Sequence, residues 1–393
     1  MTPCPNCAAD GLEQLYWVAQ IPVHSCLLIA EHQEAVDSPR GDLNLHFCRH
    51  CGFICNTAFD PATQHFVTGY EGTQGYSQTF NKWYSQTFNK FAQSLAHRWI
   101  QRYDIHQRRV LEIGCGQGEF LSLMCAQGQN QGIGLDPAYV PDRNPDQGGR
   151  IRFIKDLYSQ KYDHLEADVI ICRHTLEHIK GTQEFVQMLR RSIGQRPMRL
   201  LFELPDVLRI LREGAFWDIY YEHCSYFTPG SLARLFRANC FEVTELELDF
   251  EDQYILMGAR PAESPTEAHL PLEDDLEAVT AAVESFPAIC ERQLGKWRRL
   301  AIDSRRRVVI WGSGSKAVSF VSTLGVEKMI KHVVDINPNK HGQYMPGTGQ
   351  QIVAPEFLKE NPPDQVVVMN PVYCREIQED LDRLGLESEL VAV

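Results

Sequence analysis

The chain has 393 residues, 44% of them hydrophobic, and a formal net charge of −13. A chain of this length is expected to form two or three domains rather than one. The acidic balance argues against a wide nucleic-acid interface, which needs a basic face. It leaves room for an anionic small molecule in a local basic pocket.

The sequence gives no sign of a membrane or secreted protein. No stretch approaches the roughly 18 consecutive apolar residues of a membrane span. The N-terminal MTPCPNC lacks the basic and apolar regions of a signal peptide. The 13 cysteines are scattered along the chain, unlike a secreted disulfide framework. We therefore expect a cytoplasmic protein with reduced thiols and no membrane partner.

Two Cys-x-x-Cys pairs, CPNC and CRHC, lie near the N-terminus. Each pair can supply two thiolates from one tight turn, a pattern typical of tetrahedral zinc. Four thiolates leave no open position, so the site would be structural; the alternative is four unrelated surface cysteines. We predict a zinc-binding domain over residues 1–70, with a short strand at 27–30. The predicted ligands are Cys4, Cys7, Cys48 and Cys51.

An eight-residue segment is repeated at once, as YSQTFNKW at 76–83 and YSQTFNKF at 84–91. Eight residues overshoot two helical turns by about 80°, so the two copies cannot share one face of a helix. Two interpretations stay open. The repeat is a neutral duplication in a surface helix, or one copy lines a substrate cleft with its tyrosine hydroxyl.

The stretch RRVLEIGCGQGEFL at 108–121 predicts a strand, a glycine-rich turn and the start of a helix. Glu112 precedes the first glycine by two residues. A second strand at 132–135 ends in Asp136, where an acid takes the two hydroxyls of a ribose. A third strand at 151–154 is followed by Asp156, which is placed to meet an adenine amino group.

Two further strands, at 167–172 and 199–205, complete the order of a class I S-adenosylmethionine (SAM) methyltransferase fold. The turn glycines let the backbone approach a cofactor. Glu119 at the helix start would repel a pyrophosphate but suits a sulfonium cation, so we favour SAM over a dinucleotide. The predicted cofactor-binding residues are Glu112, Gly114, Gly116, Gly118, Asp136, Asp156, Arg173 and His174.

The last third of the chain predicts a connection and a smaller domain. Residues 263–306 read as a linker and a long helix, which Pro287 should bend or interrupt. RVVIWGSGSK at 307–316 repeats the strand, turn and helix pattern, and we predict a second parallel α/β domain over 307–393. Two of the three fingerprint glycines are present, which disfavours a second bound dinucleotide.

The stretch YYEHCSYF at 220–227 follows the fifth strand of the central domain. It shows no helical or strand period. It is too polar for a core segment and too aromatic for a solvent loop. In the predicted fold this region faces the methyl group and its acceptor.

The chain resembles, over nearly all of its length, the three-domain sugar C-methyltransferases of deoxysugar biosynthesis. The resemblance rests on the paired CxxC, on EIGCGQG, on the Leu-x-His-Ile at 176–179, on the Tyr-x-Glu-His at 220–223, and on the glycine turn around Gly312 and Gly314. It implies a zinc domain, a Rossmann-like SAM methyltransferase domain at 71–262, and a Rossmann-like C-terminal domain. It also implies SAM and Zn²⁺ as cofactors and a nucleotide-linked 4-keto-deoxysugar as acceptor.

The resemblance also implies catalytic roles. His223 would remove a proton from the carbon next to the ketone, and the enolate would attack the SAM methyl. Glu222 would orient or polarise His223, or hold the substrate, while Tyr220 and His178 would hydrogen-bond the enolate or the sugar. The predicted substrate-binding residues are Tyr76, Lys316, Asn370 and Tyr373. Structural roles stay open: His223 as a helix cap, and His178 in a TLEHI stretch found in other methyltransferases.

We therefore expect a SAM-dependent C-methyltransferase. The alternatives are a methyltransferase of another small molecule or of RNA, and a non-catalytic SAM-binding scaffold. The charge of −13 counts against RNA, and the clustered Tyr220, Glu222 and His223 count against a scaffold. Two features depart from the family pattern: the acid in RHTLEH at 173–178, and the doubled YSQTFNK segment.

Overall fold

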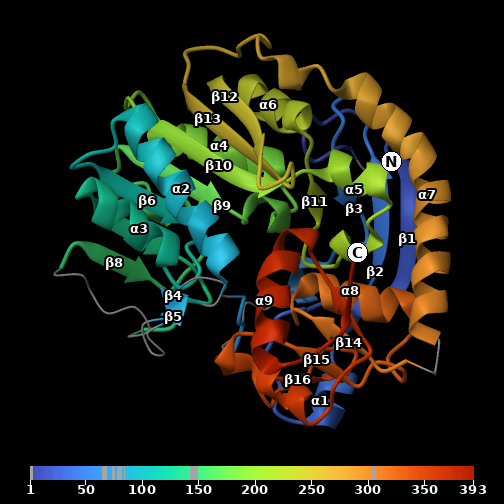
Figure 1. The fold of residues 1–393 in the computed structure, drawn as a ribbon. Helices are drawn as coiled ribbons and strands as arrows, with labels where there is room; N and C mark the ends of the chain where they lie inside the picture. The colour runs from blue at the N-terminus through green and yellow to red at the C-terminus, as the bar shows by residue number, and fades with distance from the viewer. Residues whose placement is uncertain are drawn as a thin grey trace.

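The computed structural model describes residues 3–63, 69–72, 76–77, 82–83, 85–141, 149–302 and 306–393. Within these ranges the strands form three larger sheets and one two-stranded pair, β4 (Tyr76–Ser77) with β5 (Lys82–Trp83). Figure 1 shows the central sheet and its helices on the left and the C-terminal domain at the lower right. None of the helices in the described ranges is long and apolar enough to cross a bilayer.

The N-terminal sheet has the order β1-β2-β3-β11 and is antiparallel throughout. The predicted strand at 27–30 is wrong. Its residues make only single bridges to Tyr70 and Tyr344, two different segments that offer no continuous ladder. The elements of this region are β1 (Glu13–Pro22), α1 (His32–Val36), β2 (Arg40–Phe47), β3 (Ile54–Asn56) and β11 (Ser225–Tyr226).

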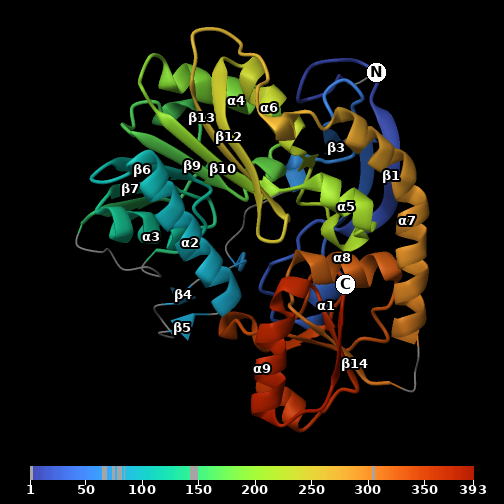
Figure 2. The ribbon, with the colours of Figure 1, turned by 45° about the horizontal axis from the view of Figure 1, so that its top comes forward.

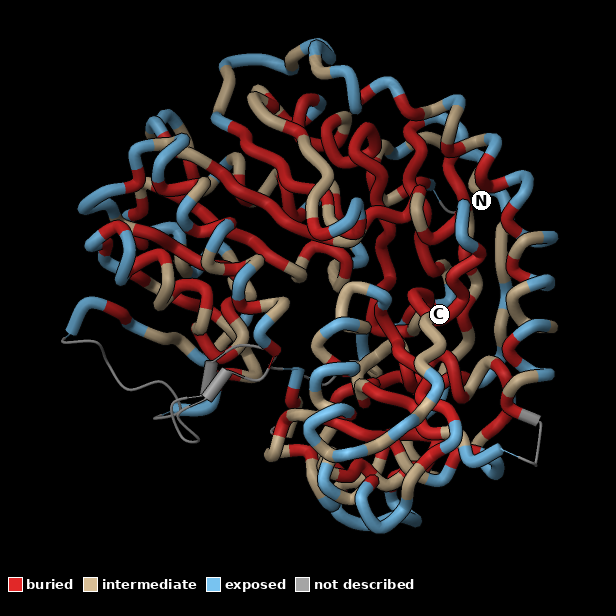
Figure 3. The backbone as a smooth tube through the Cα atoms, viewed as in Figure 1, coloured by how far each residue is buried: buried red, intermediate tan, exposed pale blue. Residues whose placement is uncertain are grey.

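The fourth strand of this sheet comes from the middle of the chain. β11 lies within the YYEHCSYF stretch, and Ser225 and Tyr226 pair with Cys55 and Ile54 of β3. Figure 1 shows the two strands side by side. Residues 221–233 are buried without interruption, and Figure 3 draws this part of the chain in red. The stretch is therefore polar and buried because it joins two domains.

The central sheet has seven strands in the order β12-β13-β10-β9-β6-β7-β8. β13 is antiparallel to both of its neighbours, and the five strands from β10 to β8 are parallel. Counted within the domain, this order is 3-2-1-4-5-7-6, which confirms the predicted class I SAM methyltransferase fold. The strands are β6 (Arg109–Ile113), β7 (Gln131–Leu135), β8 (Ile151–Ile154), β9 (Val169–Arg173), β10 (Arg199–Pro205), β12 (Phe241–Asp249) and β13 (Tyr254–Pro261).

Helices cover both faces of the central sheet (Figure 2). Alternate strand residues divide between two cores, as the period of two requires. Leu111 and Ile170 pack on the face of α4 and α6, whereas Val110 and Ile171 pack on the face of α2 and α3. The helices of this domain are α2 (Gln86–Tyr103), α3 (Glu119–Gly128), α4 (Thr182–Ile193), α5 (Val207–Glu213) and α6 (Pro229–Ala238).

The C-terminal sheet is fully parallel, in the order β16-β15-β14-β17-β18. This confirms the predicted second α/β domain. Its elements are β14 (Val308–Trp311), α8 (Ser315–Leu324), β15 (His332–Val334), β16 (Gln351–Val353), β17 (Gln365–Val368), α9 (Cys374–Leu384) and β18 (Glu389–Ala392).

One long helix, α7 (Leu276–Ile302), connects the central and C-terminal domains and contains Pro287 without a break. Figure 1 shows it running in an arc along the right side of the molecule. A proline inside a helix removes one backbone hydrogen bond. Phe286 and Trp297 of α7 are fully buried against the neighbouring domains, and this packing offsets the lost bond.

Candidate active site

Two cavities meet at the carboxyl end of the central sheet. The first, of about 780 Å³, lies over the glycine turn between β6 and α3; we call it the glycine-turn cavity. The second, of about 400 Å³, lies between the central and C-terminal domains; we call it the interdomain cavity. The two cavities share five of their lining residues: Tyr70, Gly72, Phe88, His174 and His178. A molecule in one cavity can therefore contact a molecule in the other.

The three predicted turn glycines have different surroundings. All have positive φ. A Cβ on Gly114 would lie 1.9 Å from Thr175 Oγ1, and one on Gly118 would collide with the Phe153 ring. Neither position therefore has room for a side chain. A Cβ on Gly116 would meet no atom within 4 Å. Gly114 and Gly116 line the glycine-turn cavity, and the open approach is at Gly116.

Asp136 lies at the end of β7 and lines the same cavity. Its two carboxylate oxygens accept backbone hydrogen bonds, from Gly116 at 2.8 Å and from Ala138 at 2.7 Å. Burial raises its pKa, and these two bonds oppose the rise. The carboxylate therefore ties the turn to the second strand and stands beside the cavity.

Glu112 at the end of β6 is 2% exposed and lines the glycine-turn cavity. Burial raises its pKa to about 8, against the opposing effect of Arg173. Its Oε2 has no hydrogen-bond partner within the described ranges. An unsatisfied carboxylate oxygen at a cavity wall fits a ligand that brings an N–H or a positive charge. SAM carries both.

Asp156 also lines this cavity but is held by its own loop. It accepts hydrogen bonds from Lys161, from the Tyr162 hydroxyl at 2.6 Å and from the Leu157 N–H at 2.8 Å. The bonds from Lys161 and Tyr162 lower its pKa to about 2. The predicted contact with an adenine amino group would add to an already engaged carboxylate.

Arg173 and His174, also predicted as cofactor residues, are both held by Glu203 of β10. Arg173 pairs with Glu203 and covers the Phe120 ring at 3.8 Å, and His174 Nε2 lies 2.9 Å from Glu203 Oε1. Burial raises the pKa of Glu203, but Arg173 and His174 lower it to about 2. Glu203 was not predicted as a site residue, although an acid within the apolar LLFELP strand was the available signal.

Three of the predicted catalytic residues line the interdomain cavity: Tyr220 and His223 from the stretch at 220–227, and His178 from the short helix after β9. Tyr220 Oη lies 3.0 Å from His223 Nε2, and the His178 ring packs edge-on against the His223 ring with centroids 4.8 Å apart. Burial, reinforced by His178, His174 and Lys316, lowers the pKa of His223 well below its usual value. His223 is therefore a neutral imidazole at neutral pH.

Glu222 lies on the other side of this segment. Its Oε1 is 3.8 Å from His24 Nδ1 of the N-terminal domain, and it lines neither cavity. Residues 220–223 form a turn, closed by the His223 N–H, which donates to the Tyr220 carbonyl oxygen at 3.2 Å; this turn leaves Glu222 beside His24 and His223 at the cavity. The predicted role of Glu222 in orienting His223 has no contact to support it among the described residues.

A carboxylate that was not predicted as a site residue lies at the cavity instead. Glu177 is 2% exposed and belongs to the short helix Leu176–His178 after β9. Its Oε1 lies 3.9 Å from His223 Nε2 and 3.7 Å from His174 Nδ1. The available signal was the acid in RHTLEH.

Three of the predicted substrate residues line the interdomain cavity: Lys316, Asn370 and Tyr373. Burial lowers the pKa of Lys316, whose Nζ lies 2.8 Å from Asp218 Oδ1. Asn370 exchanges two hydrogen bonds with Gln253, at 2.8 and 3.2 Å. These polar groups come from the C-terminal domain, so a molecule in this cavity would contact both domains.

The fourth, Tyr76, has a side chain outside the described residues, and its backbone pairs with Trp83 in β4 and β5. The second copy of the repeat differs from the first, because it begins α2. Ser85 caps that helix by accepting from the Phe88 N–H, and Phe88 lines both cavities. The interpretation that both copies lie in one surface helix is wrong.

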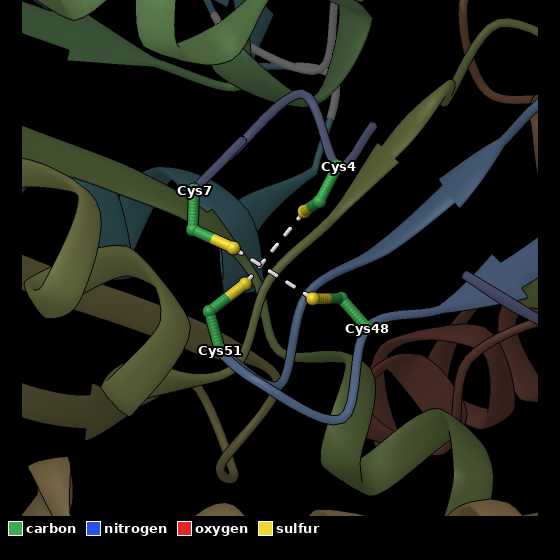
Figure 4. Close-up of side chains that lie close together, drawn as sticks. All are labelled: Cys4, Cys7, Cys48 and Cys51. Atoms are coloured by element: carbon green, nitrogen blue, oxygen red, sulfur yellow. Dashed lines mark hydrogen bonds between the residues drawn. The ribbon is translucent and has the colours of Figure 1, made fainter. Parts of the chain in front are cut away.

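The four predicted zinc ligands are gathered at one point (Figure 4). Cys4 Sγ lies 3.8 Å from Cys51 Sγ, and Cys7 Sγ lies 3.7 Å from Cys48 Sγ. Zn–S bonds of about 2.3 Å in a tetrahedron place the sulfurs about 3.8 Å apart. A disulfide would need about 2.05 Å. The donor set and its spacing therefore fit a tetrahedral metal ion.

Two family models match the chain. Residues 86–246 match a methyltransferase domain, and residues 280–388 match a C-methyltransferase C-terminal domain. The second match covers most of the C-terminal α/β domain and nearly all of α7. Residues of the first match line both cavities, whereas residues of the second line the interdomain cavity.

The C-methyltransferase NovU of Streptomyces niveus is 24% identical over 288 residues, which are 68% of this chain and 67% of NovU. A ubiquinone biosynthesis O-methyltransferase of Rickettsia bellii is 24% identical over 161 residues, 37% of this chain and 65% of that protein. The chain thus spans about two thirds of the length of these two relatives. The NovU match extends well beyond a single domain of this chain.

Among solved structures, the 1,6-didemethyltoxoflavin-N1-methyltransferase of Burkholderia thailandensis is 17% identical, with a TM-score of 0.35 over 44% of this chain and 79% of that one. The two domain matches, the NovU similarity and the strand order of the central sheet agree with one another. The chain is a SAM-dependent methyltransferase that carries a C-methyltransferase C-terminal domain.

Proposed function

We propose that this enzyme methylates the carbon next to the ketone of a nucleotide-linked keto-deoxysugar. One observation carries the proposal: the Tyr220–His223 pair lies at the interdomain cavity, and His178 beside it also lines the glycine-turn cavity. His223, a base able to remove a proton from carbon, therefore lies where an acceptor and a methyl donor would meet.

His223 acts as the base. Hydrogens next to a ketone are weakly acidic, so their removal needs a positioned base and a partner for the enolate oxygen. The depressed pKa keeps His223 unprotonated and able to accept. Tyr220 and His178 are the candidates for hydrogen bonds to the enolate or the sugar. Bound SAM supplies the electrophilic methyl group that the enolate carbon takes.

SAM is held in the glycine-turn cavity. Asp136 binds the ribose hydroxyls and Glu112 faces the cationic methionine end, where its unsatisfied Oε2 is available. Gly116 gives the open approach to the turn. Asp156 is the candidate for the adenine amino group. Arg173 and His174 shape the wall through their bonds to Glu203.

The acceptor occupies the interdomain cavity, and its nucleotide part contacts the C-terminal domain. Lys316, Asn370 and Tyr373 are the candidate contacts. Lys316 supplies a cation for a phosphate, and Asn370 and Tyr373 supply neutral hydrogen-bonding groups. Tyr76 is a further candidate by resemblance to the family.

A structural Zn²⁺ is held by Cys4, Cys7, Cys48 and Cys51. The four-sulfur spacing supports this assignment, and so does the anchoring of the first cysteine turn. The Thr182 hydroxyl donates to the Pro5 carbonyl at 3.0 Å, and Asn6 Nδ2 donates to the Ser231 carbonyl at 3.1 Å. The ion would thus fix the N-terminal domain against α4 and α6. Thiolate ligands also suit the reducing cytoplasm expected for this protein.

The test offers the enzyme a nucleoside-diphosphate 4-keto-6-deoxysugar with methyl-¹³C SAM, beside the matched sugar reduced to the 4-hydroxyl. The ketone alone should gain a ¹³C methyl on carbon and should exchange its adjacent hydrogen in deuterated water. Methylation of both sugars on oxygen, or of neither, would contradict the proposal. Labelling of RNA or of another small molecule would support the corresponding alternative, and absence of any transfer would support a scaffold.

A further inference from the structure

The carboxylate that faces His223 comes from a distant segment of the chain. Glu177 Oε1 lies 3.9 Å from His223 Nε2. The sequence neighbour, Glu222, instead lies 3.8 Å from His24. Glu177 lines the interdomain cavity, as His223 does, and Glu222 does not. The position of Glu177 is fixed by a backbone bond, because the Cys224 N–H donates to its carbonyl oxygen at 3.0 Å.

The Glu177 carboxylate is buried without hydrogen bonds from the described residues. It is 2% exposed, and in the described part of the chain neither carboxylate oxygen has a hydrogen-bond partner. The backbone of Glu177, by contrast, is tied to the stretch at 220–227. A buried carboxylate without hydrogen-bond partners is costly unless nearby charges compensate it. His174, whose Nδ1 lies 3.7 Å from Glu177 Oε1 and whose pKa is raised to about 9, supplies one such charge.

His223 is the second imidazole beside this carboxylate. Its Nε2 faces both Tyr220 and Glu177, which leaves Nδ1 for the acceptor. Proton uptake would create an imidazolium in a buried site. The other titratable groups around the ring are Tyr220, Tyr226, His178, His174 and Lys316. Since the cationic members of this set oppose a positive ring, Glu177 is the group that favours it.

We propose that Glu177 is the positioning residue of the base: it holds the Nε2–H of His223 and stabilises the imidazolium formed during proton removal. This rests on the proposed function. The acceptor C–H bond breaks, its proton goes to Nδ1, and the electron pair moves to the keto oxygen. The enolate carbon then bonds to the methyl group, whose C–S electron pair stays on sulfur, and the imidazolium returns its proton to water. The arrangement follows the logic of a histidine braced by a carboxylate on its far nitrogen.

The first test needs no acceptor. Full-length enzyme with ¹⁵N-labelled histidine is compared at pH 7.5 as wild type, Glu177→Gln and Glu222→Gln, with His223→Asn to assign the signal. Wild-type His223 should be neutral with its proton on Nε2. Glu177→Gln should shift the ring toward a mixture of tautomers, and Glu222→Gln should leave it as in wild type. The opposite ranking would overturn the proposal.

The second test uses the keto-sugar probe deuterated next to the ketone. Glu177→Gln should lower kcat by about 10- to 100-fold with little change in KM, and should raise the deuterium isotope effect as proton removal becomes slower. Glu177→Asp, which keeps the charge, should recover part of the rate. SAM affinity should persist, because Glu177 does not line the glycine-turn cavity. Unchanged kcat and isotope effect in Glu177→Gln would overturn the role of Glu177. A wild type inactive on this probe would contradict the proposed acceptor, and the tautomer measurement would still decide Glu177.

Discussion

The backbone N–H of Asn56 donates a 2.9 Å hydrogen bond to the carbonyl oxygen of Cys224. This bond lies beside the pairing of β3 with β11, and it reaches the residue that follows His223. At its other end, β3 begins three residues after the fourth cysteine, Cys51. One short strand therefore joins the four-cysteine cluster to the segment that carries His223.

Cys48→Ser should release zinc and impair acceptor chemistry while sparing SAM binding. Without the metal, β3 would lose its anchor, and the stretch at 220–227 would lose the strand with which β11 pairs. We expect less than about half an equivalent of metal, turnover reduced by about tenfold or more, and SAM affinity within about twofold of wild type. Metal analysis, turnover and calorimetry measure the three. Cys55→Ser is the matched control, because this buried cysteine lies outside the four-sulfur cluster. A full equivalent of zinc in Cys48→Ser would count against the site.

Asp136→Ala should weaken SAM binding by about 2 kcal/mol or more, since it removes charge-assisted hydrogen bonds to the ribose. The change also leaves the Gly116 and Ala138 N–H groups without the carboxylate oxygens to which they donate. Asp136→Asn keeps an oxygen acceptor, so its SAM affinity should fall between those of wild type and Asp136→Ala. Calorimetric titration with SAM measures both, and an unchanged affinity in Asp136→Ala would remove this residue from the cofactor site.

Gly114→Ala and Gly116→Ala should differ in stability although both positions have positive φ. The left-handed backbone costs each alanine about 1 to 2 kcal/mol. Gly114→Ala adds a collision with Thr175, whereas Gly116→Ala has open space. We expect the first to lower the free energy of unfolding by several kcal/mol more than the second, in urea titrations. Equal losses would contradict the close approach of Thr175 to the turn.

His174 should stabilise the fold in a pH-dependent way. Burial lowers its pKa, but Glu203 and Glu177 outweigh this and raise it to about 9. A raised pKa means that the stabilisation is fully present below the unfolded value near 6.5 and is lost as the pH rises through about 9. At pH 6 the free energy of unfolding of wild type should exceed that of His174→Gln by roughly 1 to 2 kcal/mol. This figure already allows for the partial exposure of the ring. Urea titrations at pH 6 and pH 10 measure the difference, which should shrink at the higher pH. A constant difference would mean that His174 acts by shape alone.

The architecture was predictable because its signals are local. Each strand of the methyltransferase core is an apolar run bounded by a turn, and the cysteine pairs are visible as short motifs. The strand at 27–30 failed because an apolar run does not reveal whether a neighbouring segment offers a continuous ladder. β11 was missed because two residues show no period, and its partner β3 lies far away in the sequence.

The site was predicted unevenly for the same reason. The motifs placed Tyr220, His178 and His223 together, and the structure brings these three to one cavity. The family resemblance suggested that Glu222 serves His223 or holds the substrate, but the turn at 220–223 leaves Glu222 beside His24 and away from both cavities. The carboxylate that does approach, Glu177, depends on the meeting of two loops, which no spacing in the sequence records.

His223→Asn should abolish the carbon chemistry without disturbing SAM binding. The variant keeps a polar side chain but has no nitrogen able to take a proton, and His223 does not line the glycine-turn cavity. With the keto-sugar acceptor, both deuterium exchange and methylation should fall by a factor on the order of 10² to 10⁴, the usual contribution of a positioned base. Tyr220→Phe should lose less, because water can replace a single hydroxyl at 3.0 Å from the ring. If His223→Asn kept near wild-type turnover while Glu222→Gln was inactive, Glu222 would be the base. If both stayed active, the polar residues of 220–227 would serve to join the N-terminal sheet to the central domain, and the proton would leave by another route.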